Sequence, residues 1–394
     1  MPQGGKFMRR TVISCLLVLA LAGLVLLWVG CSPTGKSEPL VVGGIFSITG
    51  PASYLGEPER NSMEMLAEEV NAKGGVNGRT LKVVIYDDEG DVTKARLHAE
   101  KLLQKDKAIT IIGPSLTHTS MAVLEITQKA QIPLVSCAAG SKITAPAKDR
   151  AWVFKTPQTD QMAVHRIYQY LQKQGLKKVA IITVSTGFGV AGKEQLLEQA
   201  PQFGLTVVAQ EVFGEKDTDM TPQLTKIRGT EAQAVICWGT GPAPALVAKN
   251  MKQLAMTIPL IQSHGAASKK FIELAGDAGE GIIMPAGKLV IYNQLPDTDP
   301  QKAVCKEYAT KYSAKFKAPE SSFGGYAHDA LRMLVIALEK SGGDPAKTRD
   351  ELEKIKKFVG VSGVFNMSPE DHNGLTPDAF VMVKISNGQF KYLD

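Results

Sequence analysis

The chain of 394 residues has few cysteines, and none of them stands in a metal-binding or redox motif. No C-x-x-C pair occurs, which argues against a zinc site and against dithiol chemistry. The six histidines include no H-E-x-x-H sequence, and no G-x-S-x-G sequence is present, so neither a metalloprotease nor an α/β-hydrolase is indicated. Three cysteines, Cys137, Cys237 and Cys305, lie beyond the N-terminal region and are expected to be buried thiols.

Basic residues are not gathered into runs, so a nucleic-acid surface is not indicated. The formal charge is +6, and residues 1–30 hold Lys6, Arg9 and Arg10 but no acid. Without these three, 42 Lys and Arg residues stand against 39 Asp and Glu residues, a net charge of +3. No basic run is interleaved with aromatic residues, and nucleic acid is therefore not an expected partner. The length suits two domains of moderate size.

The N-terminus is typical of a targeting segment. Arg9 and Arg10 precede an apolar run over residues 12–29, and Gly30 and Cys31 follow that run. A small residue before a cysteine at the end of an apolar run resembles a bacterial lipoprotein signal. In such signals the cysteine becomes the lipidated first residue of the mature chain.

Two interpretations of this segment stay open. Residues 1–30 are a cleaved signal peptide with lipidation at Cys31, or they are an uncleaved anchor, since the run is about long enough to span a bilayer. Trp28 departs from the lipoprotein signal, which usually has Leu three residues before the cysteine. Both interpretations tether the chain outside the cytoplasmic membrane, with residues 31–38 as a flexible tether.

From residue 40 onwards, short β-branched runs alternate with helical patterns. Segments 61–71 and 162–172 carry apolar residues three and four positions apart, as one buried face of a helix requires. Strands separated by helices of this length predict βαβ units and parallel sheets that are buried on both faces. The expected strands are 40–46, 81–86, 109–112, 132–136, 178–184, 205–213, 234–238 and 258–262.

The alternation changes character near residue 285. Two longer helices are expected over residues 301–316 and 321–340, followed by strands over 360–367, 379–385 and 389–393. Because helices return late in the chain, the pattern predicts an α/β protein of two doubly wound lobes whose connections cross more than once.

Small and hydroxyl-bearing residues follow three of the expected strands, at residues 47–56, 113–120 and 137–141. Ligands of open α/β sheets bind at the carboxyl ends of strands, and the helix N-termini found there attract carboxylates. Helix capping by Ser and Thr explains any one of these loops. Three of them in consecutive units favour an anion-binding cleft.

The segment Gly187-Phe188-Gly189-Val190-Ala191-Gly192 matches the G-x-G-x-x-G pattern of dinucleotide sites. Glu211 lies about twenty residues further on, as such a site requires, but it falls inside an expected strand. Nicotinamide dinucleotides are also scarce outside the cytoplasm. We therefore expect a glycine-rich turn that brings Phe188 to the edge of the sheet, and no cofactor.

From about residue 39 to its end, the chain resembles the branched-chain-amino-acid-binding proteins of ABC importers. The similar segments, in order, are Val42–Pro51, Val70–Gly78, Tyr86–Glu89, Ile112–Pro114 and Gly324–Ala330. The resemblance implies the type I periplasmic-binding fold, whose two lobes are joined by three crossover segments and close on a ligand about a hinge.

The resemblance also implies where the lobes begin and end. Crossovers are expected near residues 155–157, 284–286 and 361–363. Lobe 1 is expected over residues 39–155 and 286–361, and lobe 2 over residues 156–285 and 362–394.

Ligand positions of the family correspond to residues of both expected lobes. Thr117 corresponds to the hydroxyl that grips the amino acid's carboxylate and amino group, and Phe188 to the aromatic residue from the opposite lobe. The first-loop aromatic is shifted and is taken as Tyr54. The remaining expected ligand-binding residues are Ser115, Ala138, Ala139, Ser141, Thr240, Gly241, His264 and Tyr326.

His264 is the main departure from the family, because it stands where a carboxylate commonly pairs with the ligand's ammonium. A histidine cannot replace an anion in that role. One hypothesis is an aromatic or branched aliphatic carboxylic acid without an α-ammonium. The other is an amino acid whose ammonium binds elsewhere, for example at Glu57 or at backbone carbonyls.

The sequence thus predicts an extracytoplasmic solute-binding lipoprotein of an ABC importer, with no metal and no catalytic residues. The expected partners are a small carboxylate-bearing ligand, a permease with its ATPase subunits, and the membrane through the lipid anchor. Two alternatives stay open: a component that presents ligand to a separate sensory receptor, and an exported enzyme on the same scaffold.

Overall fold

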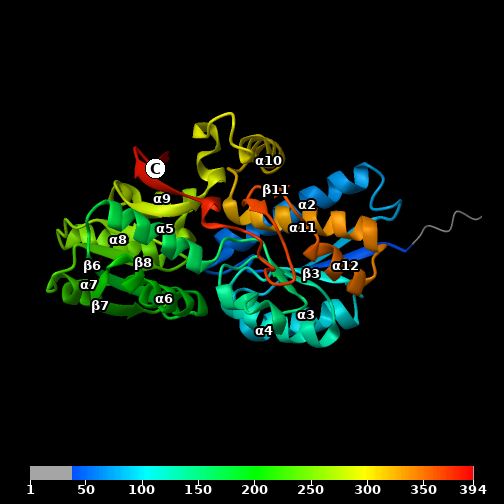
Figure 1. Cartoon of the computed structure of the whole chain (residues 1–394), viewed down its shortest axis with the longest axis horizontal. Helices are drawn as coiled ribbons and strands as arrows, with labels where there is room; N and C mark the ends of the chain where they lie inside the picture. The colour runs from blue at the N-terminus through cyan, green and yellow to red at the C-terminus, as the bar shows by residue number, and fades with distance from the viewer. Residues whose placement is uncertain (1–37, 394) are drawn as a thin grey trace, which may run out of the picture. The chain divides into compact units, whose positions relative to one another are not determined.

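Two large β-sheets organise the residues that the structure, a computed structural model, describes, namely 38–393 (Figure 1). The expected signal peptide, the lipidation site Cys31 and the tether up to residue 37 lie outside the described residues. Each sheet, with the helices packed on it, is one lobe of an α/β fold. We call the lobe of the first sheet the first lobe, and that of the other sheet the second lobe.

The first sheet has five parallel strands in the order β2-β1-β3-β4-β5. Val42 of β1 lies opposite Val83 of β2 on one side and Thr110 of β3 on the other. The burial of these short apolar strands is typical of parallel sheets covered on both faces. The strands are β1 (Leu40–Phe46), β2 (Leu81–Asp87), β3 (Thr110–Ile112), β4 (Leu134–Ser136) and β5 (Val153–Lys155).

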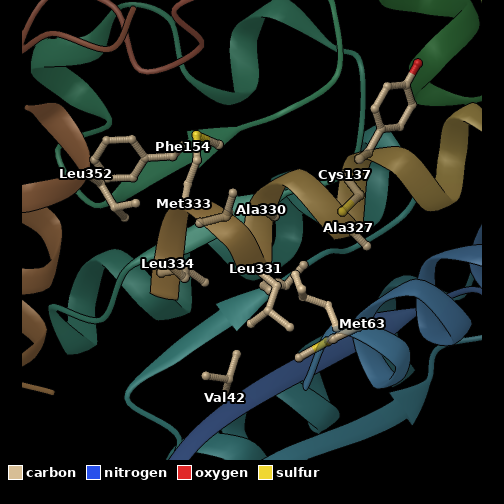
Figure 2. Packing of buried hydrophobic residues seen from close by; sticks show 14 of the residues in the cluster. Val42, Met63, Cys137, Phe154, Ala327, Ala330, Leu331, Met333, Leu334 and Leu352 are labelled. Carbon is tan, nitrogen blue, oxygen red and sulfur yellow. The ribbon is translucent and has the colours of Figure 1, made fainter. Parts of the chain in front are cut away.

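Helices cover both faces of this first sheet. Figure 1 shows α2 (Ser53–Ala72) and α11 (Ser322–Ser341) on one side of the strands, and α3 (Val92–Gln104) and α4 (Thr117–Ala130) on the other. Figure 2 shows the first of these cores, in which Leu331 of α11 lies with Val42 and Met63. α10 (Gln301–Phe316) and α12 (Pro345–Glu353) complete the lobe, so segments from both halves of the chain build it.

The second sheet has seven strands in the order β14-β13-β10-β9-β8-β6-β7. Its strands are parallel except β13, which runs antiparallel to β10, and β14, which runs antiparallel to β13. The strands are β6 (Lys178–Val184), β7 (Thr206–Phe213), β8 (Ala234–Trp238), β9 (Leu260–Gln262), β10 (Ile283–Gly287), β13 (Phe380–Ser386) and β14 (Gln389–Tyr392).

Two separate cores hold helices against the two faces of the second sheet. α5 (Asp160–Lys173) and α6 (Gly187–Gln199) belong to one core. α7 (Thr221–Arg228), α8 (Ala243–Gln253) and α9 (Lys269–Ala275) belong to the other. The second lobe is therefore doubly wound as well, and the predicted fold class is confirmed.

Three crossover segments connect the lobes, from β5 to α5, from β10 to α10 and from β12 (Val364–Phe365) to β13. The fully buried carboxylate of Asp329 on α11 accepts hydrogen bonds from the N–H groups of Val361 (2.9 Å) and Ser362 (2.7 Å). The side-chain amide of Asn373 donates to the carbonyl oxygen of Pro157 at 2.9 Å. The segment just before β12 is thus fixed to α11, and the first and third crossovers are fixed to each other.

The prediction of a single strand over residues 360–367 is wrong. β11 (Phe358–Val359) pairs antiparallel with β12, and the N–H of Gly360 donates to the carbonyl of Gly363 at 2.8 Å, which makes a tight turn. A Cβ at Gly360 would lie 2.6 Å from Oδ2 of Asp329, so the glycine allows the turn to approach that carboxylate. The contact with α11, not local strand propensity, sets the conformation here.

The three cysteines of the described chain are buried and unpaired, as predicted. Among residues 38–393, no group of three or more His, Cys, Asp and Glu side chains is arranged to hold a metal ion. No helix in that same part of the chain combines the length and the hydropathy needed to cross a membrane.

Candidate ligand-binding cleft

A small cavity of about 30 Å³ lies between residues of the two lobes. The first lobe contributes the loops after β3 and β4 and the faces of α2 and α11, while the second contributes the loops after β6, β8 and β9. Ligands of open α/β sheets bind at these carboxyl ends of strands. The lining residues are Leu55, Ser115, Leu116, Thr117, Cys137, Ala139, Pro157, Phe188, Thr240, His264, Gly265, Phe323 and Tyr326.

Seven of the eleven residues expected to bind ligand therefore line one cavity. Four do not line it: Tyr54, Ala138, Ser141 and Gly241. Ala138 is buried in the core under α3 and α4, and the N–H of Ser141 donates to Asp160 at 3.1 Å. Tyr54 and Gly241 meet each other beside the cavity, as described below.

Thr117 is the first residue of α4, and its buried side chain faces the cavity. Its hydroxyl Oγ1 has no hydrogen-bond partner among the described residues. The first N–H groups of a helix have no partners within the helix, and the helix dipole is positive at this end. Thr117 thus presents a hydroxyl beside a helix terminus that favours an anion.

The glycine-rich motif at the start of α6 has a packing role. A Cβ on Gly189 would lie 1.7 Å from the carbonyl oxygen of Val184, and a Cβ on Gly192 would lie 2.1 Å from Nε1 of Trp238. Gly187 lies against His118, so the N-termini of α6 and α4 approach each other across the lobes. The glycines bring α6 close to β6 and β8, and Phe188 then reaches the cavity.

His264 is enclosed by aromatic rings and is only 4 % exposed. Ring centroids of Phe188, Trp238 and Phe380 lie 5.4, 5.6 and 5.3 Å from its own. Burial, together with the charge of Lys155, lowers the pKa of His264 to about 3. The imidazole is therefore neutral, and its two nitrogens, which lack partners among the described residues, offer one donor and one acceptor.

Tyr54 joins the two lobes beside the cavity. Its hydroxyl accepts a hydrogen bond from the N–H of Gly241 at 2.7 Å and donates to the carbonyl oxygen of Gly265 at 3.4 Å. Its ring meets that of Phe323 edge to face at 5.5 Å. Burial raises the pKa of the Tyr54 hydroxyl, so it stays protonated and keeps its role as a donor.

Glu59 is a buried carboxyl that the sequence interpretation missed. It is fully buried on α2, and one of its oxygens accepts a hydrogen bond from the hydroxyl of Ser115. A signal was available, since Glu59 shares the apolar face of its helix with Leu55 and Leu66. Glu57, the ammonium partner considered above, has a side chain that is 60 % exposed and does not line the cavity.

Lys155 is a second buried charged group that the sequence did not reveal. It lies at the end of β5, and its ammonium donates to the carbonyl oxygen of Ala139 at 2.5 Å. Burial lowers the pKa of Lys155 to about 7, while Asp160 and Asp371 oppose that shift. This ammonium stands behind the loop that follows β4.

Residues 39–389 match the model of a protein family described as periplasmic binding protein. The chain belongs to the periplasmic binding protein family. Members of this family bind solutes and are not enzymes, so the enzyme alternative is set aside. Membership implies a location outside the cytoplasm, and the family resemblance predicted from the sequence is confirmed.

Relatives of this periplasmic binding protein support the assignment. Over 310 residues it is 24 % identical to a leucine-, isoleucine-, valine-, threonine-, and alanine-binding protein of Pseudomonas aeruginosa, with 77 % of this chain and 79 % of that protein covered. An extracellular ligand-binding receptor from Rhodopseudomonas palustris superposes with a TM-score of 0.85 at 28 % identity, covering 90 % of this chain and 99 % of that one.

A further solved structure shares the fold of this periplasmic binding protein. It is the branched-chain amino acid transporter substrate-binding protein of Streptococcus pneumoniae in complex with isoleucine. The TM-score is 0.80 at 23 % identity, with 90 % of this chain and 98 % of that one covered. The type I periplasmic-binding fold is thereby established, with its two lobes and three crossovers.

Proposed function

We propose that this periplasmic binding protein is the solute-binding component of an ABC importer, and that it binds a small carboxylate-bearing ligand between its lobes. The observation that supports this proposal best is the hydroxyl of Thr117, buried and unpartnered at the N-terminus of α4 in the cavity wall. A ligand carboxylate would accept its hydrogen bond and would gain from the positive helix terminus.

The walls indicate what the rest of the ligand resembles. Leu55, Leu116, Phe188 and Phe323 make most of the cavity apolar, which suits a branched aliphatic or aromatic body. His264 is neutral and supplies no anion for an α-ammonium. An aromatic or aliphatic carboxylic acid is therefore our first candidate, and a branched-chain amino acid, as bound by the named relatives, is the second.

Calorimetric titration of ligand-free protein tests this proposal. The panel holds leucine, valine, benzoate and the hydroxybenzoates, and we expect at least one of them to bind. Thr117→Ala should weaken the binding by about tenfold or more, because a hydrogen bond to a charged group is lost. Thr93→Ala, at an exposed position of α3, is the control and should bind as the wild type does. Unchanged affinity in Thr117→Ala would show that Thr117 does not bind the ligand carboxylate.

We further propose that lipid on Cys31 anchors the protein at the outer face of the cytoplasmic membrane, where a permease and its ATPase subunits receive the ligand. The sequence motif at residues 30–31 supports this. Mass spectrometry of the mature N-terminus tests it: a diacylated Cys31 is expected, and an intact segment 1–30 would instead mean an uncleaved anchor.

A further inference from the structure

The hydroxyl of Ser115 is a polar group in a cavity wall that is mostly apolar. Its oxygen accepts a hydrogen bond from the N–H of Ser47 at 3.0 Å, and its proton is donated to the carboxyl of Glu59. A serine hydroxyl has one proton and two acceptor sites. Since the proton and one site are occupied, Ser115 can offer the cavity only one lone pair, as a hydrogen-bond acceptor.

Glu59 holds Ser115 in this orientation. Its second oxygen, Oε1, is buried and has no partner among the described residues. Ser115 lines the cavity, so the carboxyl of Glu59 lies behind the part of the wall that Ser115 forms. Burial raises the pKa of Glu59 well above its usual range, and the charge of Asp88 adds to the effect, which favours a neutral carboxyl. Because Oε2 accepts the hydrogen bond from Ser115, the proton of the neutral carboxyl lies on Oε1.

The hydroxyl of Tyr326, like that of Ser115, already donates its proton to a neighbouring side chain. Its hydroxyl donates to Oε1 of Gln158 at 3.1 Å, and the amide of Gln158 is fixed by a 2.6 Å hydrogen bond to the carbonyl oxygen of Ser362. Tyr326 therefore also turns an oxygen lone pair, and no proton, to its other neighbours. Ser115 and Tyr326 both line the cavity, and both hydroxyls are acceptors, so they suit a ligand group that brings a proton.

We propose that Ser115, positioned by Glu59, accepts a hydrogen bond from a hydroxyl group on the ligand, so that the protein prefers hydroxylated carboxylic acids to their unsubstituted parents. A hydroxyl brings one proton and no charge. An ammonium would bring three protons and a positive charge among Leu55, Leu116 and Phe323, where such a charge is costly to bury. This inference rests on the proposed carboxylate binding.

The experiment compares matched ligand pairs by calorimetry. The pairs are benzoate with its 2-, 3- and 4-hydroxy derivatives, and valine with threonine, in which a hydroxyl replaces a methyl group. In the wild type, at least one hydroxylated member should bind about ten- to a hundredfold more tightly than its parent. In Ser115→Ala the affinity ratio, that of the hydroxylated acid over that of its parent, should fall to about one.

Variants of Glu59 test its positioning role. Glu59→Gln retains an oxygen acceptor for Ser115, so the affinity ratio should stay close to that of the wild type. Glu59→Leu frees the Ser115 proton, so the affinity ratio should fall to about one. Loss of the ratio in Glu59→Gln would show that a charged carboxylate is needed, and would overturn the choice of a hydroxyl over an ammonium. Glu57→Gln, the same change at an exposed position of the same helix, is the control.

The outcomes separate this inference from the proposed function. If the parent acids bind and no hydroxyl improves their binding, the Ser115 subsite is refuted and the carboxylate proposal stands. If no carboxylate of the panel binds, both fail. If Glu59→Leu does not fold, Ser115→Ala and Glu59→Gln still decide the matter.

Discussion

Several buried polar atoms beside the cavity have no partners within residues 38–393. Thr117 Oγ1, both ring nitrogens of His264 and Oε1 of Glu59 have no hydrogen-bond partner among the described residues. An unsatisfied buried polar group costs about 1–3 kcal/mol, so a stable protein keeps such groups few. Those beside the cavity can gain partners from a bound ligand.

The neutral state of His264 predicts a pH dependence of stability. The folded protein holds its pKa at about 3, whereas the unfolded chain takes up the proton near 6.5. Between these values the unfolded state binds more protons, so the free energy of unfolding falls as the pH drops from 6.5 to 3. This group alone contributes a slope of at most about 1.4 kcal/mol per pH unit.

Denaturant unfolding of wild type and His264→Phe at several pH values between 4 and 7 checks this. Since the carboxyls are common to both proteins, the difference between the two isolates the histidine. We expect the wild type to lose stability more steeply on acidification than the variant. If the free energy of unfolding falls equally steeply with pH in both proteins, His264 is charged in the folded protein or the unfolded state does not titrate as assumed.

At the scale of elements, the approach of α6 to the second sheet shapes one wall of the cavity. Gly192 faces Trp238, whose ring packs against Phe188 and His264. Both of those residues line the cavity. The distance between α6 and β8 therefore fixes the aromatic wall, and the glycines of the motif set that distance.

Gly192→Ala should destabilise the protein even though alanine favours helices. Helix propensity gains about 1 kcal/mol, but a Cβ at 2.1 Å from the Trp238 ring forces the helix or the ring to move, at a cost of about 1–3 kcal/mol. Thermal unfolding should show a net loss of stability, together with weaker ligand binding. Val190→Ala in the same helix, at a site that is 52 % exposed, should change little. A more stable Gly192→Ala would contradict this packing.

Helices and strands were predictable from the sequence where an unbroken run of neighbouring residues is buried. β1, β6 and β8 are predicted with their observed bounds, because parallel strands buried on both faces read as unbroken apolar runs. β5 and β10 carry no such signal; they are short strands at the crossovers and depend on neighbours far along the chain. Glu59 was missed for a similar reason, since its partner Ser115 lies 56 residues away.

At the scale of the whole two-lobed unit, Tyr54 makes a partly buried polar contact between the lobes. The ion pairs Lys142–Glu194 and Lys269–Glu320 also join them, but the lysines are exposed and such pairs contribute little. The hydroxyl of Tyr54 forms hydrogen bonds with Gly241 and Gly265 of the second lobe. The closed arrangement therefore depends on this one side chain more than on the surface charges.

Tyr54→Phe should favour the open state. The change keeps the ring contact with Phe323 but leaves the N–H of Gly241 without its acceptor. This should destabilise the closed state relative to the open state by about 1 kcal/mol. Ligand affinity should fall roughly fivefold, with a larger radius of gyration at sub-saturating ligand in X-ray scattering. Tyr392→Phe, at an exposed site, is the control. Wild-type affinity in Tyr54→Phe would show that the hydroxyl does not contribute to closure.

A crystal structure with the tightest-binding acid of the panel will show where the ligand carboxylate binds. We expect the ligand between the two lobes, with its carboxylate within hydrogen-bond distance of Thr117 Oγ1 and its body against Phe188. A ligand bound outside this cavity, or one whose carboxylate lies at Ser115 while Thr117 stays unpartnered, would contradict this expectation.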